Sequence, residues 1–286
     1  MENDNVITCS NLSKNYGKNI IFDNLSIDIP GGITGLVAPN GYGKTTFIEM
    51  CCGLRSITSG EIKILGKNIS NAKEHIGLIS DKPVFPPNIT VEDYIKIISD
   101  LYNVDIDANL LELSEIKKVY KYRIRELSAG YLKRFAFVIS MLHEPELVFA
   151  DEPFSNVDIN AIKSMQSMVQ NYNKKGISFI IASHDLKELT DISDRVLLID
   201  GQKLKEIKYE KNKNVVEIAS SNNDELYDYL KGDFDAIKGE NLTVYYDEIK
   251  ELLLKLSNYS GDIMKIKTID SKEGLLNEID HAINKD

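Results

Sequence analysis

The chain has 286 residues, of which 43% are hydrophobic and 27% are charged. This ordinary globular composition excludes a collagen-like chain, a low-complexity disordered chain and a small disulfide scaffold. A chain of this length is expected to form about two domains. No run approaches the roughly 18 consecutive apolar residues of a membrane-spanning helix, and Met1–Asp4 lacks the basic and apolar features of a signal peptide. We therefore expect a cytoplasmic protein.

Acidic residues outnumber basic ones, 44 to 34, which gives a formal net charge of −10. Only 5 of the basic residues are Arg. Nucleic-acid binding requires a basic face and often Arg side chains, so we expect no nucleic-acid partner. The cysteines are Cys9, Cys51 and Cys52. Neighbours on a helix point about 100° apart, so we expect small buried apolar residues rather than a zinc site.

Strand-like and helix-like segments alternate along the first 212 residues, which is typical of an α/β fold. The short, largely apolar runs are 33–37, 147–150 and 177–182, as expected for strands that are buried on both faces of a parallel sheet. Residues 89–102 and 128–143 have helical patterns, and Thr90 with Asp93 resembles a capping box. Residues 195–199 and 202–207, joined by Asp200-Gly201, predict a closing hairpin.

The character of the sequence changes after about residue 213. Residues 222–286 contain 15 acidic and 8 basic residues, so most of the net charge lies there. Strand-like and helical patterns alternate again, at 215–219, 224–230, 242–246, 247–259, 264–269 and 271–283. We predict two domains, 1–212 and a small acidic α/β module at 213–286.

A glycine-rich segment follows the first apolar strand and precedes a helical pattern at 45–54. It reads Ala-Pro-Asn-Gly-Tyr-Gly-Lys-Thr-Thr, from Ala38 to Thr46. Backbone N–H groups and the helix N-terminus of such a loop bind phosphate, so small residues are needed where the backbone meets the ligand. Lys44 would reach the β- and γ-phosphates, and the Thr45 hydroxyl would coordinate Mg²⁺. The predicted contacts are Ala38, Asn40, Gly41, Tyr42, Gly43, Lys44, Thr45 and Thr46.

A second apolar strand ends in two carboxylates, Asp151 and Glu152, followed by Pro153. The carboxyl ends of parallel strands are where such sheets bind ligands. We expect Asp151 to hold the hydration shell of Mg²⁺. Glu152 is the natural base for polarising an attacking water.

With these motifs in this order, residues 5–212 resemble the ATP-binding subunit of an ABC transporter. Leu127-Ser-Ala-Gly-Tyr131 is similar to the family signature, with Ala129 and Tyr131 as departures. Ser155–Asp158 resembles the loop that crosses the family's dimer interface. The resemblance implies a P-loop NTPase: a mostly parallel core sheet, an N-terminal antiparallel β subdomain and a helical subdomain at about 89–144. The C-terminal α/β module lies outside it.

The resemblance also implies roles for four further residues. Ser128 and Gly130 would contact the γ-phosphate of an ATP bound to a partner subunit. His184, after the last apolar strand, resembles the switch histidine that senses the γ-phosphate, and Tyr16 resembles the aromatic that stacks on adenine. One chain would then be unable to complete a site, so a dimer is implied; one complete motif set favours a homodimer, with a heterodimer still open.

One position departs from the family in a way that matters for metal binding. In the segment Gly77–Pro83 the family carries a Gln that contacts Mg²⁺ and the membrane partner, whereas this chain has Asp81. We expect Asp81 to keep the magnesium role and to shift the metal affinity. Its shorter side chain could equally leave the ion without that contact.

The resemblance implies an ATPase that powers a separate integral-membrane permease, on the cytoplasmic face of the membrane. The single nucleotide domain with a compact C-terminal module resembles exporter ATPases for drugs, antibiotics or antimicrobial peptides. Two alternatives stay open at this point: a soluble ABC ATPase that acts on a macromolecular complex, and a catalytically weak partner in a heterodimeric transporter. A kinase or GTPase of another phosphate-loop family would lack the segments around Ser128 and His184.

Overall fold

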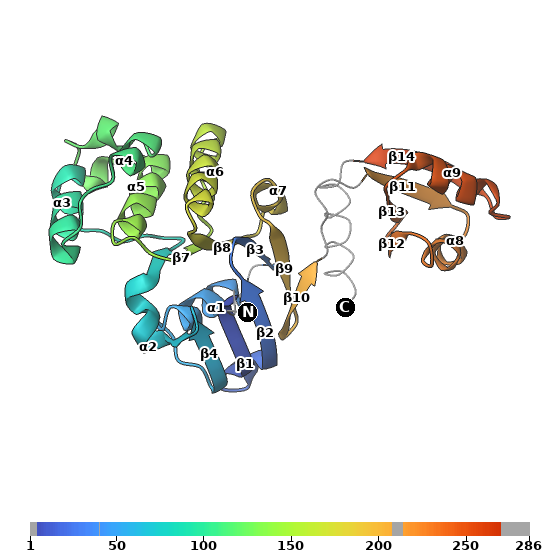
Figure 1. Cartoon of the computed structure of the whole chain (residues 1–286), viewed down its shortest axis with the longest axis horizontal. Coiled ribbons are helices and arrows are strands. Elements are labelled where there is room, and N and C mark those ends of the chain that lie inside the picture. Colours follow the sequence, from blue (N-terminus) through green and yellow to red (C-terminus); the bar gives the residue numbers. More distant parts are fainter. Residues whose placement is uncertain (1–4, 40, 208–213, 270–286) are drawn as a thin grey trace. The chain divides into compact units, whose positions relative to one another are not determined.

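The computed structural model describes residues 5–39, 41–207 and 214–269 (Figure 1). The chain divides into two compact units, Met1–Ile207 and Lys208–Asp286. Each unit has its own sheets and its own core, and they are described separately. No helix in the described ranges is both long and apolar enough to cross a membrane.

The first sheet of unit 1 is the expected N-terminal antiparallel subdomain. Its four strands have the order β2-β1-β4-β5, and every neighbouring pair is antiparallel. The strands are β1 (Asn5–Tyr16), β2 (Asn19–Pro30), β4 (Ser59–Ile64) and β5 (Lys67–Asn68). The short α2 (Ile69–Ala72) follows β5.

The second sheet has six strands in the order β10-β9-β3-β8-β7-β6, and it confirms the predicted mostly parallel core. Only the hairpin pair β9–β10 is antiparallel. The strands are β3 (Ile33–Val37), β6 (Ile76–Ile79), β7 (Leu147–Asp151), β8 (Ser178–Ser183), β9 (Arg195–Asp200) and β10 (Lys203–Ile207). Every residue of β3, β7 and β8 is buried, which is why these strands are predominantly apolar.

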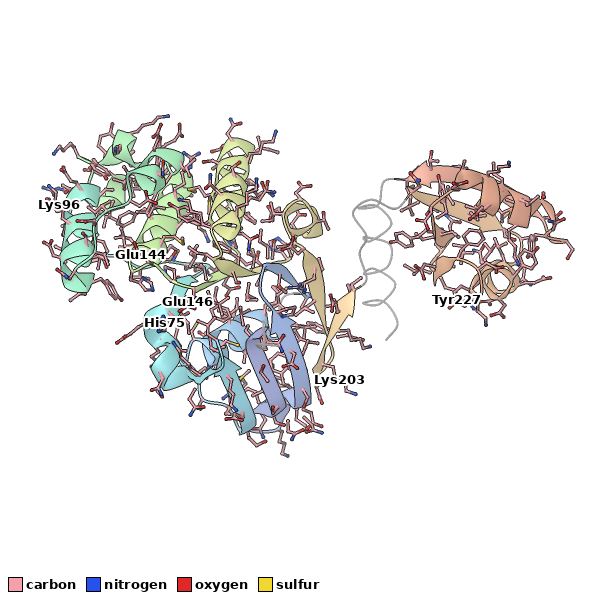
Figure 2. The ribbon with its side chains drawn as sticks, in the orientation of Figure 1. His75, Lys96, Glu144, Glu146, Lys203 and Tyr227 are labelled. Atoms are coloured by element: carbon pink, nitrogen blue, oxygen red, sulfur yellow. The ribbon has the colours of Figure 1, made fainter. Side chains whose placement is uncertain are left out.

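A polar clamp fixes the starts of β6 and β7 side by side. The His75 Nδ1 atom lies 2.9 Å from Oε1 of Glu146, and the Glu146 backbone N–H donates to the carbonyl of His75 at 2.9 Å (Figure 2). The parallel pairing carries this alignment along to Ile79 and Ala150. As a result, Asp81 and Asp151, which follow or end these strands, reach the same edge of the sheet.

The core of unit 1 is shared by both sheets. Helix α1 (Lys44–Cys51) contributes Phe47, Ile48 and Cys51 to one buried cluster that also includes residues of the antiparallel and the parallel sheet. The Phe22 and Phe47 rings meet edge to face, with centroids 6.0 Å apart. All three cysteines are free and buried, as predicted, and burial raises the pKa of Cys9 to about 12. These thiols therefore behave as apolar side chains.

A group of helices separates β6 from β7 and forms the expected helical subdomain (Figure 1). It contains α3 (Val91–Tyr102), α4 (Ala108–Leu113), the 3₁₀ turn at Ile116–Val119 and α5 (Ala129–Met141). Thr90 caps α3 as predicted, because its hydroxyl accepts from the Asp93 N–H. Edge-to-face contacts among Phe85, Tyr94 and Phe135 join α3 to α5.

Two further helices complete unit 1, α6 (Ile159–Lys174) and the short α7 (Leu186–Thr190). The side chain of Asp158 caps α6 and accepts from the N–H groups of Asn160 and Ala161, both at 3.0 Å. Helix α6 follows the Asp151–Glu152 edge directly, so its start is fixed next to that edge.

Unit 2 is a small α/β module. Its sheet is antiparallel throughout, in the order β12-β13-β11-β14, with strands β11 (Asn214–Ser220), β12 (Asp235–Lys238), β13 (Leu242–Tyr246) and β14 (Ile263–Ile269). Helices α8 (Asn223–Leu230) and α9 (Ile249–Ser257) each place two leucines in one buried cluster with Val216, Ile218 and Val244; these leucines are Leu226, Leu230, Leu252 and Leu256. The sequence did not predict β12, and the helix expected at 271–283 lies outside the described residues.

Candidate active site

The phosphate loop lies between β3 and α1, as predicted, and two of its glycines have left-handed backbones. Gly41 has φ 88° and Gly43 has φ 102°. A Cβ atom on Gly43 would lie 2.7 Å from Cγ2 of Ile21, so the loop passes too close to β2 for a side chain. Helix α1 begins immediately afterwards, so its free N–H groups open towards the loop. Asn40, one of the predicted contacts, lies outside the described residues.

Lys44 is buried beneath this loop. Its ammonium donates to the carbonyl of Ala38 at 2.7 Å and lies 3.6 Å from Oε1 of Glu152. The side chain is 7% exposed. The hydrogen bond to Ala38 therefore joins the two ends of the loop. The charge of Lys44 faces the edge of the sheet where Glu152 lies.

Asp151 and Thr45 present oxygen atoms at this edge. The Thr45 hydroxyl donates to Oδ2 of Asp151 at 2.6 Å. The other carboxylate oxygen, Oδ1, is buried and has no hydrogen-bond partner among the described residues. Burial raises the pKa of Asp151; the Thr45 hydrogen bond opposes this shift, and the nearby Glu152 carboxylate adds to it. An unpartnered carboxylate oxygen beside a hydroxyl is the kind of hard oxygen donor set that suits Mg²⁺.

Glu152 has a left-handed backbone, with φ 47°, which is uncommon for a residue other than glycine. Its N–H donates to the carbonyl of Ala182 on β8 at 2.8 Å. Its carboxylate Oε2 lies 2.8 Å from Nδ1 of His184, and its side chain is only 14% exposed. The structure therefore brings together two predicted catalytic residues that are 32 positions apart in the sequence.

Asp81 reaches the same edge from the end of β6. Its Oδ1 lies 3.2 Å from the Ser155 hydroxyl and 3.6 Å from Nζ of Lys133. Lys133 also donates to the backbone carbonyls of Asp81 and Glu152, at 2.6 Å and 2.9 Å. Lys133 was not among the residues predicted from the sequence. The available signal was a lysine in the middle of a helix whose neighbours are predominantly apolar.

These residues surround a single cleft of about 240 Å³. Its lining residues are Gly41, Gly43, Lys44, Thr45, Thr46, Asp81, Asp151 and Glu152. Five phosphate-loop residues and three carboxylates thus meet at one place.

Five predicted nucleotide contacts among the described residues do not line this cleft, and one of them is Ala38, whose carbonyl binds Lys44. Tyr16 and Tyr42 are exposed, and the ring of Tyr16 is flanked by the Lys14 ammonium at 4.6 Å and the Arg55 guanidinium at 5.5 Å. Ser128 and Gly130 lie at the start of α5, where the Ser128 hydroxyl accepts from the Tyr131 N–H at 3.4 Å. The start of α5 is thus capped by Ser128 itself.

Residues 22–155 match the model of the ABC transporter family. The chain is 32% identical over 244 residues to the bacitracin transport ATP-binding protein BcrA of Bacillus licheniformis, and the match covers 80% of each protein. The chain belongs to the ABC transporter family. This ABC ATPase binds and hydrolyses ATP, and it couples hydrolysis to transport through a separate membrane permease.

Other similarities agree with this assignment. The ABC ATPase is 28% identical over 218 residues to the lantibiotic transport ATP-binding protein SrtF of Streptococcus pyogenes, covering 74% of this chain and 95% of that protein. Among solved structures, cbiO1 of Clostridium perfringens, part of the ABC transporter complex cbiONQ, has a TM-score of 0.63 at 22% identity, covering 71% of this chain and 87% of that one. An ATP-binding subunit of an ABC transporter has a TM-score of 0.66 at 18% identity, over 88% and 100% of the two chains. These structures share the fold.

Proposed function

We propose that this ABC ATPase powers the export of a peptide antibiotic or a related drug-like compound. The observation that carries the proposal is the similarity to the bacitracin transport protein, which extends over 80% of both chains and so well beyond the part matched by the family model. Lantibiotics and bacitracin are both antimicrobial peptides, which supports this cargo class. The choice of cargo belongs mainly to the permease, to which the ATPase would attach on the cytoplasmic face of the membrane.

The phosphate loop would hold the nucleotide. The N–H groups at the start of α1 and the ammonium of Lys44 would bind the phosphates, because both present positive charge to one cleft. Tyr16, exposed at the end of β1, would stack on adenine. Lys44 is already held at the loop by Ala38, so its charge is preorganised for the γ-phosphate.

Thr45, Asp151 and Asp81 would hold Mg²⁺. The buried, unpartnered Oδ1 of Asp151 supports this role, as does the position of Asp81 in the same cleft. Phosphate oxygens and water would complete the ligand set, because Mg²⁺ is usually held by one or two carboxylates and keeps several waters. The ion, when bound, neutralises charge on the phosphates.

Glu152 would act as the general base. Its carboxylate is close to both Lys44 and His184, so it would orient a water towards the γ-phosphate and polarise it for attack. His184, which is 56% exposed on its side chain, would hold that carboxylate while it contacts the γ-phosphate from its free side. Both roles require the left-handed turn at Glu152, because it aims the carboxylate into the cleft.

The site would be completed by a second copy of the chain. Ser128 and Gly130 lie outside the cleft formed by the phosphate loop, which supports a contact to an ATP held by a partner. The complete set of motifs in one chain favours a homodimer. In this proposal residues 1–212 form the catalytic domain, and the acidic module at 213–286 is an appendage.

The cargo proposal is tested by resistance in living cells. The chain is expressed with the membrane protein encoded next to it, in a bacterial strain sensitive to bacitracin and to a lantibiotic. Wild type is expected to raise the inhibitory concentration of one of these peptides at least fourfold, whereas Lys44→Ala, which removes the phosphate-binding charge, leaves it unchanged. The proposal would be contradicted if cells that express wild type and cells that express Lys44→Ala were equally sensitive to both peptides.

A further inference from the structure

A buried lysine from the helical subdomain joins two loops of the catalytic edge. Lys133 lies on the second turn of α5, and its ammonium donates to the carbonyl of Asp81 at 2.6 Å and to the carbonyl of Glu152 at 2.9 Å. The third N–H of the ammonium faces the Asp81 carboxylate, whose Oδ1 is 3.6 Å away. One side chain therefore contacts the loop after β6 and the loop after β7.

The burial of this charge needs compensation. The Lys133 side chain is only 8% exposed, and burial lowers the pKa of its ammonium, while the carboxylate of Asp81 opposes that shift. A buried ammonium is retained only where acceptors and an opposite charge surround it. Both carbonyls and the Asp81 carboxylate meet that need, so the charges at positions 81 and 133 balance each other.

The backbone of Glu152 also depends on its neighbours. A non-glycine residue in the left-handed region is strained and persists only where surrounding contacts fix it. The Glu152 N–H donates to the carbonyl of Ala182, and the Glu152 carbonyl accepts from Lys133 at 2.9 Å and from the hydroxyl and N–H of Ser155 at 2.9 Å and 3.3 Å. Among the residues that the structure describes, Lys133 is the only charged donor to this carbonyl.

We propose that Lys133 is a positioning residue for ATP hydrolysis. Its ammonium holds the Glu152 backbone in the conformation that aims the carboxylate into the cleft, and it fixes the Asp81 loop alongside, with its charge balancing the Asp81 carboxylate. The inference rests on the proposed role of Glu152 as general base. Because Lys133 is not among the residues that line the nucleotide cleft, its loss should reduce turnover and spare nucleotide binding.

The test uses the full chain and compares Lys133→Met with Arg134→Met. Arg134 is the next residue on α5, is also buried, and pairs with Glu115 at 2.6 Å rather than with the catalytic edge. Three quantities are measured: kcat and KM for Mg·ATP, the affinity for a fluorescent ATP analogue in EDTA, and the melting temperature. We expect Lys133→Met to lower kcat at least tenfold, with KM and the metal-free affinity changed less than threefold. Arg134→Met should lower the melting temperature and change kcat less than threefold.

A second pair of variants separates hydrogen bonding from charge, and it covers the case in which Lys133→Met does not fold. The amide of Lys133→Gln can still donate to both carbonyls but has no charge, so it should recover part of the lost kcat. Asp81→Asn removes the opposite charge. We expect Lys133→Gln and Asp81→Asn each to lower the melting temperature measured without metal. The variant that carries both substitutions should lower it by less than the sum of the two single effects.

Two results would overturn the inference while the proposed function stands. In the first, wild type hydrolyses ATP and the kcat of Lys133→Met is within twofold of wild type; where Lys133→Met does not fold, the same result for Lys133→Gln counts instead. The other is a parallel loss of turnover and metal-free nucleotide binding, which indicates general disruption. Additive melting temperatures in the Asp81–Lys133 cycle would overturn the charge pair. Failure of wild type to hydrolyse ATP would overturn the proposed function and this inference together.

Discussion

Single side chains at the catalytic edge are held mainly by backbone carbonyls. Lys44 binds the carbonyl of Ala38, and Lys133 binds those of Asp81 and Glu152, each at 2.9 Å or less. Their nearest carboxylate oxygens are both 3.6 Å away. The carbonyl bonds fix where each ammonium lies, and the longer charge contacts set the local field.

Glu188 on α7 provides a pH-dependent readout of the same region. Its Oε2 accepts from the Ser183 hydroxyl at 3.0 Å. Burial raises the pKa of Glu188; the Ser183 hydrogen bond opposes this shift, while the Asp185 and Glu152 carboxylates add to it. A raised pKa in the folded state means that the folded chain holds this proton more tightly. The resulting stability is present below the ordinary pKa and is lost as the pH rises through the raised pKa.

We therefore expect Glu188→Gln to remove this loss. The melting temperature of the nucleotide-free variant should exceed that of wild type at pH 7.5, and the difference should shrink towards pH 4. Circular dichroism melts at pH 4, 5.5 and 7.5 measure it. A constant difference would show that ionisation of Glu188 does not affect stability, and a difference that grows towards low pH would show that ionised Glu188 stabilises the fold. Either result would contradict the prediction.

The residues of the phosphate loop and the Asp151–Glu152 pair could be predicted from the sequence. Their placement around one cleft follows from their positions in the chain, since the ends of parallel strands meet at one edge. Lys133 could not be predicted in the same way. Its partners are 52 and 19 positions away, so a lysine within a largely apolar helix could indicate a buried charge but could not indicate its contact with Asp81 or Glu152.

At the scale of elements, the types were predictable and several boundaries were not. Helix α5 begins at Ala129 because the Ser128 hydroxyl caps it, which its sequence suggested. Helix α1 ends at Cys51, three residues earlier than its apolar pattern predicted, because the chain turns at Gly53 with φ 68°. Strand β12 was missed because four residues, Asp-Ala-Ile-Lys, have no strand signal of their own and pair only through β13.

The packing of β4 on β1 depends on one glycine. A Cβ atom on Gly60 would lie 2.3 Å from the carbonyl oxygen of Asn11 and 2.7 Å from Cα of Leu12, both backbone atoms. Gly66 has a similar positive φ, but nothing lies within 4 Å of its Cβ position. We expect Gly66→Ala to cost about 1 kcal/mol for backbone strain. Gly60→Ala should cost about 3 kcal/mol or more, because overpacking adds to that strain.

Chemical denaturation of the two variants measures the difference. Gly66→Ala is the matched control, because it shares the strain and lacks the clash. If the two substitutions lowered the free energy of unfolding by the same amount, the predicted clash between a Gly60 side chain and β1 would be contradicted.

At the scale of the whole molecule, the catalytic cleft and unit 2 share no residues. Every residue that lines the cleft belongs to the unit Met1–Ile207, and the buried cluster around Val216 and Leu252 belongs to the other unit. The change in charge and pattern near residue 213 predicted domains at 1–212 and 213–286, and the structure divides into the units Met1–Ile207 and Lys208–Asp286. The role of the acidic module was not, because its residues carry no recognisable chemical motif.

A chain truncated after residue 212 should therefore fold and bind ATP. We expect its melting transition to be cooperative and its affinity for ATP to lie within threefold of the full chain. Differential scanning calorimetry and nucleotide titration test this. Aggregation of the truncated chain, or loss of nucleotide binding, would show that the module is part of the catalytic unit.

The proposed mechanism is tested most directly by comparing wild type with Glu152→Gln in the presence of Mg²⁺ and ATP. The rate of ATP hydrolysis and the oligomeric state are measured for both. We predict that wild type hydrolyses ATP. The variant should lose at least about 100-fold of turnover, the contribution of a general base, and should accumulate as an ATP-bound dimer in light scattering. Lys44→Ala is the control that should neither turn over nor dimerise. Turnover of Glu152→Gln within tenfold of wild type would contradict the assignment of Glu152 as the base, and a monomeric variant at saturating ATP would contradict the two-chain site.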